Sequence, residues 1–164
     1  MDAQVYVRVD NRLLHGQVVQ FWIGHLEIAH LVVADDDMAE NEAMQTIYRM
    51  ALPETVELSV NTIRDLPAEL ERSAGHSTMV LLRGVQDLTC ALECGAEFSR
   101  VTLGNVHAAP ERARVTDSVY LSEEEVRALA RLKANEIEIE IQTFPGEILR
   151  LVVDGEGGAR WSRP

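Results

Sequence analysis

Strand-like and helix-like segments alternate along most of the chain, and this alternation constrains the fold more than any other feature. Apolar runs such as L-V-V-A at residues 31–34 and M-V-L-L at residues 79–82 are typical of parallel strands that are covered on both faces. The connections between segments are short. The pattern therefore predicts an α/β protein with an open, doubly wound, mostly parallel sheet and helices on both faces. A length of 164 residues fits a single domain.

The predicted elements follow from hydrophobic periodicity and from capping signals. The strand-like runs are Gln4–Val9, His30–Ala34, Val56–Val60, Thr78–Leu82, Arg100–Leu103, Asp117–Leu121 and Glu136–Thr143. The helix-like segments are Gln17–His25, Met38–Leu52, Thr62–Ala74, Val85–Gly95 and Glu123–Asn135. Ser122, with Glu125 three residues later, predicts a capping box for the last helix. Pro67 predicts that the third helix starts near that residue or is kinked there.

Two patterns stand out toward the C-terminus. Strict alternation from Glu136 to Gln142 predicts a half-exposed strand near an edge of the sheet, with isoleucines inward and glutamates outward. The Gly-rich tail, Asp154 to Pro164, is expected to be a loosely ordered end. Ile148–Val153 has the composition of a short helix or strand that could dock on the domain.

Charge and hydropathy limit the classes of partner. The formal net charge is −12, from 27 acidic and 15 basic side chains, which disfavours nucleic acid and anionic lipid. A small anion in a local positive pocket, or a protein with a basic patch, remains compatible with this charge. No apolar run approaches the roughly 20 residues that span a bilayer. The first residues lack the pattern of a signal peptide, so we expect a cytoplasmic protein.

The loop predicted after the first strand contains the residues best suited to chemistry. Its sequence is D-N-R-L-L-H-G-Q-V, from Asp10 to Val18. Arg12 and His15 lie together there, and we expect Gly16 to let the chain bend into the helix that begins near Gln17. An imidazole nitrogen is a usable nucleophile at neutral pH, and an arginine fork stabilises phosphate or carboxylate charge. The pair therefore indicates chemistry on a phosphoryl group.

The predicted fold also says which residues can surround this loop. In open α/β sheets ligands bind beyond the carboxyl ends of the strands, where the strand order reverses. The first strand is often central, so the loops after the second and fifth strands are its expected neighbours. The candidate site-lining residues from those loops are Asp35, Asp36, Gly104, Asn105 and His107. A helix-capping role is an equally good interpretation of the Asp35–Asp37 run.

The two cysteines give no sign of a metal site. Cys90 and Cys94 are spaced i, i+4 and have no histidine nearby, and this spacing is not the redox C-x-x-C. We therefore interpret them as buried apolar residues.

The loop sequence R-V-D-N-R-L-L-H-G-Q-V at residues 8–18 closely resembles R-I-D-D-R-L-I-H-G-Q-V. The latter is the active-site signature of the mannose/sorbose-type EIIB components of the bacterial phosphoenolpyruvate-dependent sugar phosphotransferase system. The resemblance continues through L-V-V-A-D-D-D-M-A-E-N-E and, more loosely, through V-L-L-R-G-V-Q-D and L-G-N-V-H. It covers about residues 3–145. Residues 1–145 would then form an EIIB-like phosphocarrier domain, and residues 146–164 a C-terminal extension.

This resemblance implies a protein-phosphohistidine–sugar phosphotransferase. His15 would accept a phosphoryl group from a phosphohistidine on an EIIA partner. It would then pass the group to a sugar bound by membrane-embedded EIIC and EIID partners, so that the chain lies peripheral to the permease when assembled. No metal or organic cofactor is required.

The residue types fit these implied roles. His15 and Arg12 would be the catalytic residues, with Arg12 on the equatorial phosphoryl oxygens. Asp10 could orient the imidazole or Arg12 by a hydrogen bond. The residues expected to bind phosphate or to orient the loop are Asp10, Asn11, Gly16 and Gln17. Asn11 replaces an aspartate that is common in the family, which removes a negative charge and keeps a hydrogen-bonding side chain.

Two other classes of function stay open. One is a regulatory phosphohistidine protein of an incomplete phosphotransferase system, in which phosphorylated His15 is a signal and no sugar moves. The other is a non-enzymatic α/β module whose crevice binds a small anion. Transfer to sugar requires permease partners, so their absence would favour regulation. A chain that binds an anion and never accepts phosphate would favour the third hypothesis.

Overall fold

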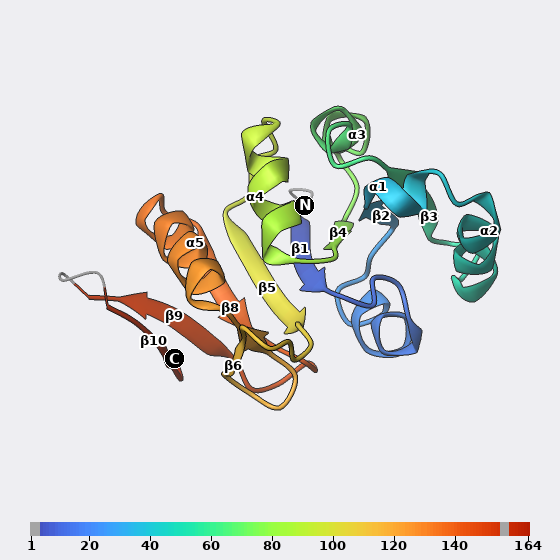
Figure 1. Cartoon of the computed structure of the whole chain (residues 1–164). Helices are drawn as coiled ribbons and strands as arrows, with labels where there is room; N and C mark the ends of the chain where they lie inside the picture. The colour runs from blue at the N-terminus through green and yellow to red at the C-terminus, as the bar shows by residue number, and fades with distance from the viewer. Residues whose placement is uncertain (1–3, 155–157) are drawn as a thin grey trace.

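One eight-stranded sheet forms the middle of the molecule in the computed structural model, which describes residues 4–154 and 158–164 (Figure 1). The strand order is β10-β9-β8-β5-β1-β4-β2-β3, and the six strands from β8 to β3 are parallel. β9 and β10 extend the sheet as antiparallel strands. The predicted open, mostly parallel sheet is confirmed.

The bounds of the elements are as follows. The strands of the sheet are β1 (Val5–Asp10), β2 (His30–Ala34), β3 (Glu57–Asn61), β4 (Thr78–Leu82), β5 (Arg100–Asn105), β8 (Glu138–Ile141), β9 (Leu149–Val153) and β10 (Ala159–Ser162). A separate two-stranded ribbon contains β6 (Ala113–Arg114) and β7 (Tyr120–Leu121). The helices are η1 (Val18–Ile23), which is a π-helix, α1 (Asp36–Ala39), α2 (Glu42–Ala51), α3 (Leu66–Arg72), α4 (Val85–Glu93) and α5 (Glu123–Ala134).

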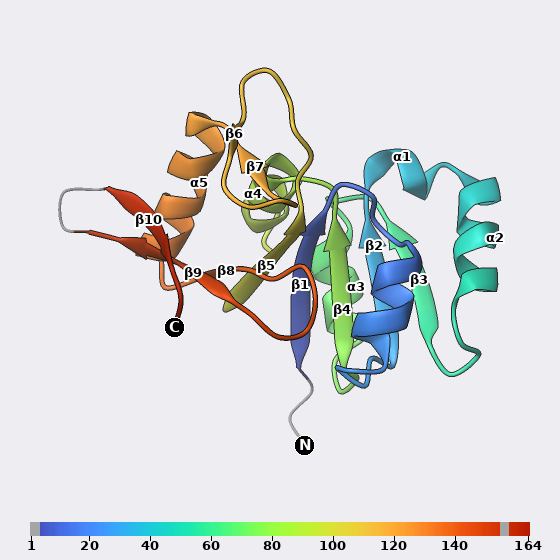
Figure 2. The same ribbon diagram turned by 90° about the horizontal axis from the view of Figure 1, so that it is seen from below.

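The chain winds away from β1 in one direction and returns in the other. From β1 it moves outward to β2 and β3, and η1 and α2 pack on one face of the sheet. It then runs back through β4, β5 and β8, with α3, α4 and α5 on the opposite face (Figures 1 and 2). Because parallel crossovers are right-handed, reversing the direction of travel moves the helices to the other face. The fold is therefore doubly wound, as predicted. The connection after β1 lies on one face of the sheet, and the helices after its neighbours β4 and β5 lie on the other.

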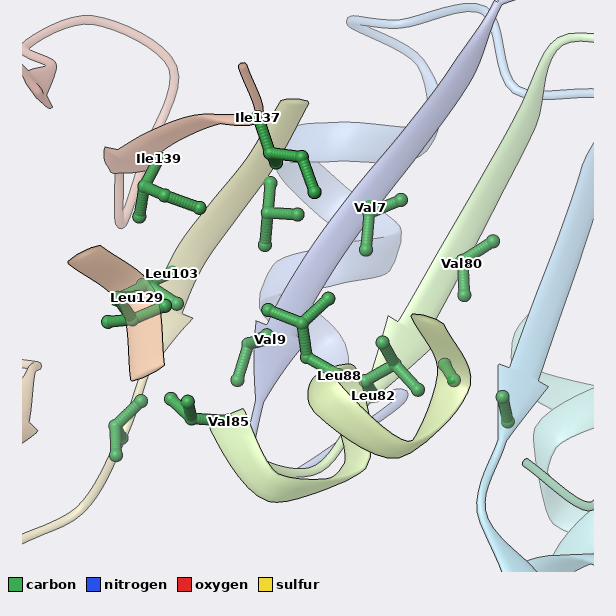
Figure 3. Packing of buried hydrophobic residues seen from close by; sticks show 14 of the residues in the cluster. Val7, Val9, Val80, Leu82, Val85, Leu88, Leu103, Leu129, Ile137 and Ile139 are labelled. Atoms are coloured by element: carbon green, nitrogen blue, oxygen red, sulfur yellow. The ribbon is translucent and has the colours of Figure 1, made fainter. Parts of the chain in front are cut away.

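Each face of the sheet has its own hydrophobic core. On one face Val7 and Val9 of β1 pack with Leu82 of β4 and Leu88 of α4 (Figure 3). The core of the other face contains Leu13, Val18, Trp22, Leu31 and Leu81, among others. Side chains alternate between faces along a strand, so Arg8 and Asp10 point away from the two valines of β1. Two polar residues of β1 therefore lie on the η1 face, where the chain leaves the strand.

The prediction that β8 lies near an edge was wrong. β5 pairs with one side of β8 and β9 with the other, so two further strands separate β8 from solvent at that end of the sheet. Glu140, expected to face outward, is 3% exposed. β5 and β9 cover it on both sides, and its charge is balanced by Arg150 of β9, 3.1 Å from its carboxylate, and by Arg100, 3.8 Å away. Glu138 likewise pairs with Arg100 of β5.

Two other predicted elements are divided or shortened in the structure. The predicted helix Met38–Leu52 is two helices, α1 and α2, because Asn41 ends the first segment and caps the second by accepting a 3.0 Å hydrogen bond from the Met44 amide. The strand predicted at Asp117–Leu121 shortens to β7 and lies outside the main sheet. α3 begins one residue before Pro67, as predicted, and the Ser122 capping box is confirmed.

The C-terminal segment also differs from expectation. Leu149–Val153 does dock as a strand, which was one of the two forms expected. Of the tail expected to be loosely ordered, Ala159–Ser162 forms β10 and pairs with β9, whereas residues 155–157 lie outside the described part. The cysteines Cys90 and Cys94, expected to be buried, are both exposed. Within the residues that the structure describes, no helix has the length and apolar character needed to cross a membrane.

Candidate functional site

The loop from Asn11 to Gln17 leaves the carboxyl end of β1 at the point where the winding of the sheet reverses. β1 pairs with β4 on one side and β5 on the other, and the helices that follow those two strands pack on the opposite face from η1. The connection after β1 therefore separates from the connections after its neighbours, which is the position where open α/β sheets bind ligands. The pairing of β1 with β5 shifts between Val9 and Asp10, which is where the loop begins.

Asp10, the last residue of β1, organises this loop. Its side chain is 0% exposed. One carboxylate oxygen, Oδ2, lies 3.0 Å from Nε2 of His15 and 3.5 Å from a guanidinium nitrogen of Arg8. The other oxygen, Oδ1, accepts a 3.1 Å hydrogen bond from the Arg12 amide. An ionised carboxylate only accepts hydrogen bonds, so Nε2 of His15 must carry the proton in this contact.

The charge state of Asp10 results from opposing effects. Burial of the carboxyl group favours its neutral form, but the hydrogen bond from His15 and the positive charge of Arg8 outweigh burial and hold the pKa of Asp10 below its ordinary value. Asp10 is therefore a carboxylate at neutral pH. A negative charge thus lies against the imidazole of His15.

The other ring nitrogen of His15 is the nucleophilic one. With the proton on Nε2, Nδ1 keeps its lone pair. That nitrogen accepts only a long hydrogen bond, 3.3 Å, from the Gln17 amide. The His15 side chain is 16% exposed, so solvent reaches part of the ring. Nδ1 can therefore attack an electrophile that arrives from outside the protein.

Arg12 belongs to the same loop. Its Nε is 3.5 Å from Oδ1 of Asp10, and one of its terminal nitrogens donates a 2.8 Å hydrogen bond to the Gln17 side chain. The Arg12 side chain is 41% exposed, so it is anchored at two points and still open to a ligand. A guanidinium held in this way can bind phosphoryl oxygens.

The bend of the loop is at Leu13, and the expectation that Gly16 would make it was wrong. Leu13 has a φ of 55°, a left-handed conformation that is unusual for a residue with a branched side chain. Leu13 keeps this conformation because its side chain is buried in the core under η1 and its amide donates a 2.9 Å hydrogen bond to the Asp10 carbonyl. Gly16 has a negative φ and open space where a Cβ would be.

Arg8 is a site residue that the sequence interpretation missed. It is 2% exposed, and it donates hydrogen bonds to the carbonyls of Gln142 at 2.8 Å and Thr143 at 3.3 Å. The ring of Trp22 stacks 4.8 Å from the guanidinium carbon. Burial lowers the pKa of Arg8 to about 10, although the charge of Asp10 opposes this. The sequence did contain a signal for Arg8. Valines alternate with Arg8 and Asp10 along the first strand, which places both charged side chains on one face of the sheet.

Two residues at the end of β5 contact the residues of this site. A Cβ at Gly104 would lie 2.1 Å from the Arg8 guanidinium, so that only a glycine leaves room for this arginine. The backbone carbonyl of Asn105 accepts a 3.0 Å hydrogen bond from the Asn11 amide, and the side chains of these two asparagines are also hydrogen-bonded. The structure thus brings Gly104, Asn105 and Asn11 together with the Asp10 loop.

The remaining candidates lie apart from this network. Asp35 caps α1 by accepting a 2.9 Å hydrogen bond from the Met38 amide, and Arg83 lies 2.7 Å from its other oxygen. Burial opposes ionisation of Asp35, but the Arg83 contact outweighs it and lowers the pKa. Asp36 accepts a hydrogen bond from the Ile63 amide, and His107 is exposed. Across residues 4–154 and 158–164, no hydrogen bond or ion pair links these three candidates to the His15 loop.

The structure, as far as it describes the chain, contains no group of three or more His, Cys, Asp or Glu side chains that could hold a metal ion.

Comparison with known proteins decides the family. The family model described as the PTS system sorbose subfamily IIB component matches residues 4–150. The chain belongs to this family. Its members are phosphotransferases that carry phosphoryl groups in sugar transport.

Individual relatives agree with this IIB assignment. The fructose-specific EIIB component of Bacillus subtilis is 25% identical over 145 residues, which cover 87% of this chain and 89% of the relative. The N-acetylgalactosamine-specific IIB component 2 of Escherichia coli is 27% identical over 144 residues, covering 87% and 92%. The crystal structure of manxB from Thermoanaerobacter tengcongensis superposes with a TM-score of 0.80 at 28% identity, covering 90% of this chain and 92% of that one.

The contact between Gly104 and Arg8 gives a stability prediction for this IIB chain. Gly104→Ala places a methyl group inside the space of the Arg8 guanidinium, so we expect the free energy of unfolding to fall by about 1–3 kcal/mol, as for overpacked cores. Gly24→Ala is the matched control, because Gly24 has a helical φ of −71° and open space at its Cβ position. Chemical denaturation measures both variants. Equal stability of the two would show that Arg8 is not held against Gly104.

The lowered pKa of Asp10 predicts a specific dependence of stability on pH. A carboxyl group with a folded-state pKa below its ordinary 3.8 stabilises the fold above that pH, and this contribution disappears as the pH falls through the folded-state pKa. The difference in unfolding free energy between the wild type and Asp10→Asn should therefore be constant near neutral pH and shrink below about pH 4. Denaturation titrations at several pH values measure this difference. A gap that stays constant down to about pH 3 would contradict the lowered pKa.

Proposed function

We propose that this IIB chain accepts a phosphoryl group on Nδ1 of His15 and passes it to a sugar. The donor is the phosphohistidine of an EIIA-type protein, and the acceptor sugar is held by a membrane permease of the EIIC and EIID type. The observation that carries the proposal is the 3.0 Å contact between Asp10 and Nε2 of His15, which leaves Nδ1 as a nucleophile on a partly exposed ring.

The first step is an in-line displacement at phosphorus. The lone pair of Nδ1 forms a bond to phosphorus as the N–P bond of the donor breaks, and the electron pair of that bond returns to the donor imidazole. Nε2 of His15 keeps its proton throughout, so the ring gains positive character. The carboxylate of Asp10 lies against that ring and stabilises the charge as it develops.

The second step reverses this charge movement. A sugar hydroxyl oxygen attacks phosphorus as its proton passes to solvent, and the electron pair of the N–P bond returns to Nδ1. A phosphorylated imidazole that still carries the Nε2 proton is a good leaving group, because departure restores a neutral ring. The hydrogen bond from Nε2 to Asp10 favours that protonated form. The same carboxylate therefore assists both transfers.

Arg12 provides the complementary charge for the phosphoryl oxygens. Its guanidinium is bound to the Gln17 side chain, and the Gln17 amide in turn contacts Nδ1 of His15. A phosphoryl group on Nδ1 therefore forms next to a positive charge that is already in position. Fixed charge of this kind requires no reorganisation during transfer.

The names of the relatives support the partners in this proposal. One stretch of 137 residues matches the mannose-specific EIIAB component of Escherichia coli at 25% identity and covers 42% of that protein. The relatives act on fructose, N-acetylgalactosamine and mannose according to their names, so a hexose or an N-acetylhexosamine is the proposed sugar class. This chain would work in the cytoplasm at the inner side of its permease.

Loss of His15 tests the proposal directly. The wild-type chain, incubated with phosphoenolpyruvate, the general phosphotransferase proteins and EIIA-type donors, should gain one acid-labile phosphoryl group by intact-mass spectrometry. His15→Ala should gain none and keep its fold, because the variant lacks the imidazole that Asp10 holds in place. His25→Ala is the control, since His25 is also exposed and lies outside the loop. Full phosphorylation of His15→Ala would overturn the proposal, and no phosphorylation of the wild type with any active donor would favour an anion-binding role.

The role of Arg12 is tested by the rate of transfer. Arg12→Ala should slow phosphorylation of His15 by roughly 10²–10³, the effect of removing one charge-stabilising donor. Rapid-quench measurement of the phosphorylated fraction gives this rate. Arg127→Ala serves as the control, because Arg127 is an exposed arginine on α5 paired with a carboxylate of its own helix. If the Arg12 variant reacts as fast as wild type, Arg12 is a surface residue only.

A further inference from the structure

Phe21 and Phe144 form an exposed aromatic pair outside the catalytic network. Their ring centroids lie 5.4 Å apart, with the rings at 90° to each other. Phe21 belongs to η1, and Phe144 belongs to the loop between β8 and β9, which reaches toward η1 (Figure 2). Phe21 is 41% exposed and Phe144 is 46% exposed, so the pair leaves a large part of its apolar surface in water. Exposed apolar surface of this kind marks interaction sites more often than isolated apolar residues do.

A chain of contacts links the residue before Phe144 to the reactive histidine. The Thr143 carbonyl lies 3.3 Å from an Arg8 nitrogen, and that nitrogen lies 3.5 Å from Oδ2 of Asp10. Oδ2 is in turn 3.0 Å from Nε2 of His15. The Thr143 carbonyl oxygen is therefore no more than about 10 Å from the His15 ring, and Phe144 is the next residue in the chain.

A protein that delivers a phosphoryl group to His15 has to cover this region. Transfer requires phosphorus to come within roughly 3–3.5 Å of Nδ1, so the surfaces of donor and acceptor must touch at the loop. A specific interface buries about 800 Å² on each partner, which corresponds to a disc of roughly 16 Å radius. The backbone of Phe144, next to the Thr143 carbonyl, therefore lies inside a disc of that size centred on His15, and Phe21 packs against the Phe144 ring.

We propose that Phe21 and Phe144 are the apolar anchor on which the phosphohistidine-bearing donor protein docks. This inference rests on the proposed function, since it assumes that a donor approaches His15. Large aromatic side chains are enriched in protein interfaces, and a few such buried anchors contribute most of the binding energy. The donor surface that fits is an apolar patch next to its phosphohistidine.

A groove next to Phe144 shows how the donor surface would fit. It has a volume of about 380 Å³, and its apolar walls come from Ile141, Phe144, Pro145 and Leu149. The Ser118 and Thr143 hydroxyls at its side are 2.5 Å apart and share a hydrogen bond. Asp117 and Glu147 also line the groove, so it offers an apolar side chain of the donor both apolar and acidic neighbours.

Other exposed apolar residues lack this relation to His15. Val5 is 41% exposed, the same fraction as Phe21, but it begins β1 and lies at the opposite end of that strand from Asp10. Met50 is 82% exposed and lies in the last turn of α2, a helix that returns toward the amino ends of the strands. Exposure alone therefore does not distinguish the pair, whereas its position within a donor footprint does.

The experiment measures the kinetics of phosphoryl transfer from the EIIA-type protein that phosphorylates the wild type fastest. Phe144→Ala and, separately, Phe21→Ala should raise KM for the phosphorylated donor by about tenfold or more and leave kcat within about twofold, as expected when an interface anchor is removed. Met50→Ala, which removes a more exposed apolar side chain, should match the wild type in both constants. Circular dichroism and denaturation show whether each variant is folded. If one phenylalanine variant does not fold, the KM of the other still tests the inference.

The possible results separate the inference from the proposed function. If the wild type accepts a phosphoryl group on His15 and both phenylalanine variants keep the wild-type KM, the proposed function stands and the docking inference is overturned. A fall in kcat at constant KM overturns it too, because the pair would then position the loop. An unchanged KM for the donor with impaired transfer to sugar assigns the surface to the permease, and a dimer that Phe144→Ala dissociates assigns it to a second copy. Both outcomes contradict a donor anchor.

Discussion

The hydrogen bond between the buried carboxylate of Asp10 and Nε2 of His15 is the interaction on which the rest of the site depends. It fixes the ring orientation, selects the tautomer and places a negative charge where positive charge develops during transfer. A buried carboxylate is costly unless it is paired and hydrogen-bonded. Arg8 and Arg12 supply that pairing. The two arginines therefore stabilise the buried carboxylate on which the proposed transfer depends.

The fold supports this arrangement from two sides. The central sheet places Asp10 at the end of β1, where the following loop diverges from the connections after the neighbouring strands. From the side, Gly104 makes room for the Arg8 guanidinium, and the carbonyls that follow β8 bind it. Leu13 stores an unfavourable backbone conformation that the core under η1 holds in place. The reactive loop is thus set by packing and not by its own preferences.

Sequence patterns predicted the parts of this structure that depend on local chemistry. Continuous apolar runs identified the parallel strands, and Ser122 identified a capping box. The loop motif pointed to His15, Asp10 and Arg12, which the structure brings into contact. The predictions failed where distant strands decide the outcome. β8 is interior because β9 pairs with it, which the alternation from Glu136 to Gln142 does not reveal. The contact of Gly104 with Arg8 joins residues nearly a hundred positions apart, and no local pattern encodes it. The exposed cysteines were misjudged because their spacing says nothing about which helix face is covered.

The most direct measurement is the site of phosphorylation within the His15 ring. The chain, labelled with ¹⁵N at histidine and phosphorylated by an active donor, can be studied by ¹⁵N and ³¹P NMR, which distinguish the two ring nitrogens. We expect phosphorus on Nδ1, with the Nε2 proton still hydrogen-bonded to Asp10. Phosphorus on Nε2 would contradict the proposed transfer through Nδ1, because the contact between Nε2 and Asp10 would have to break before transfer.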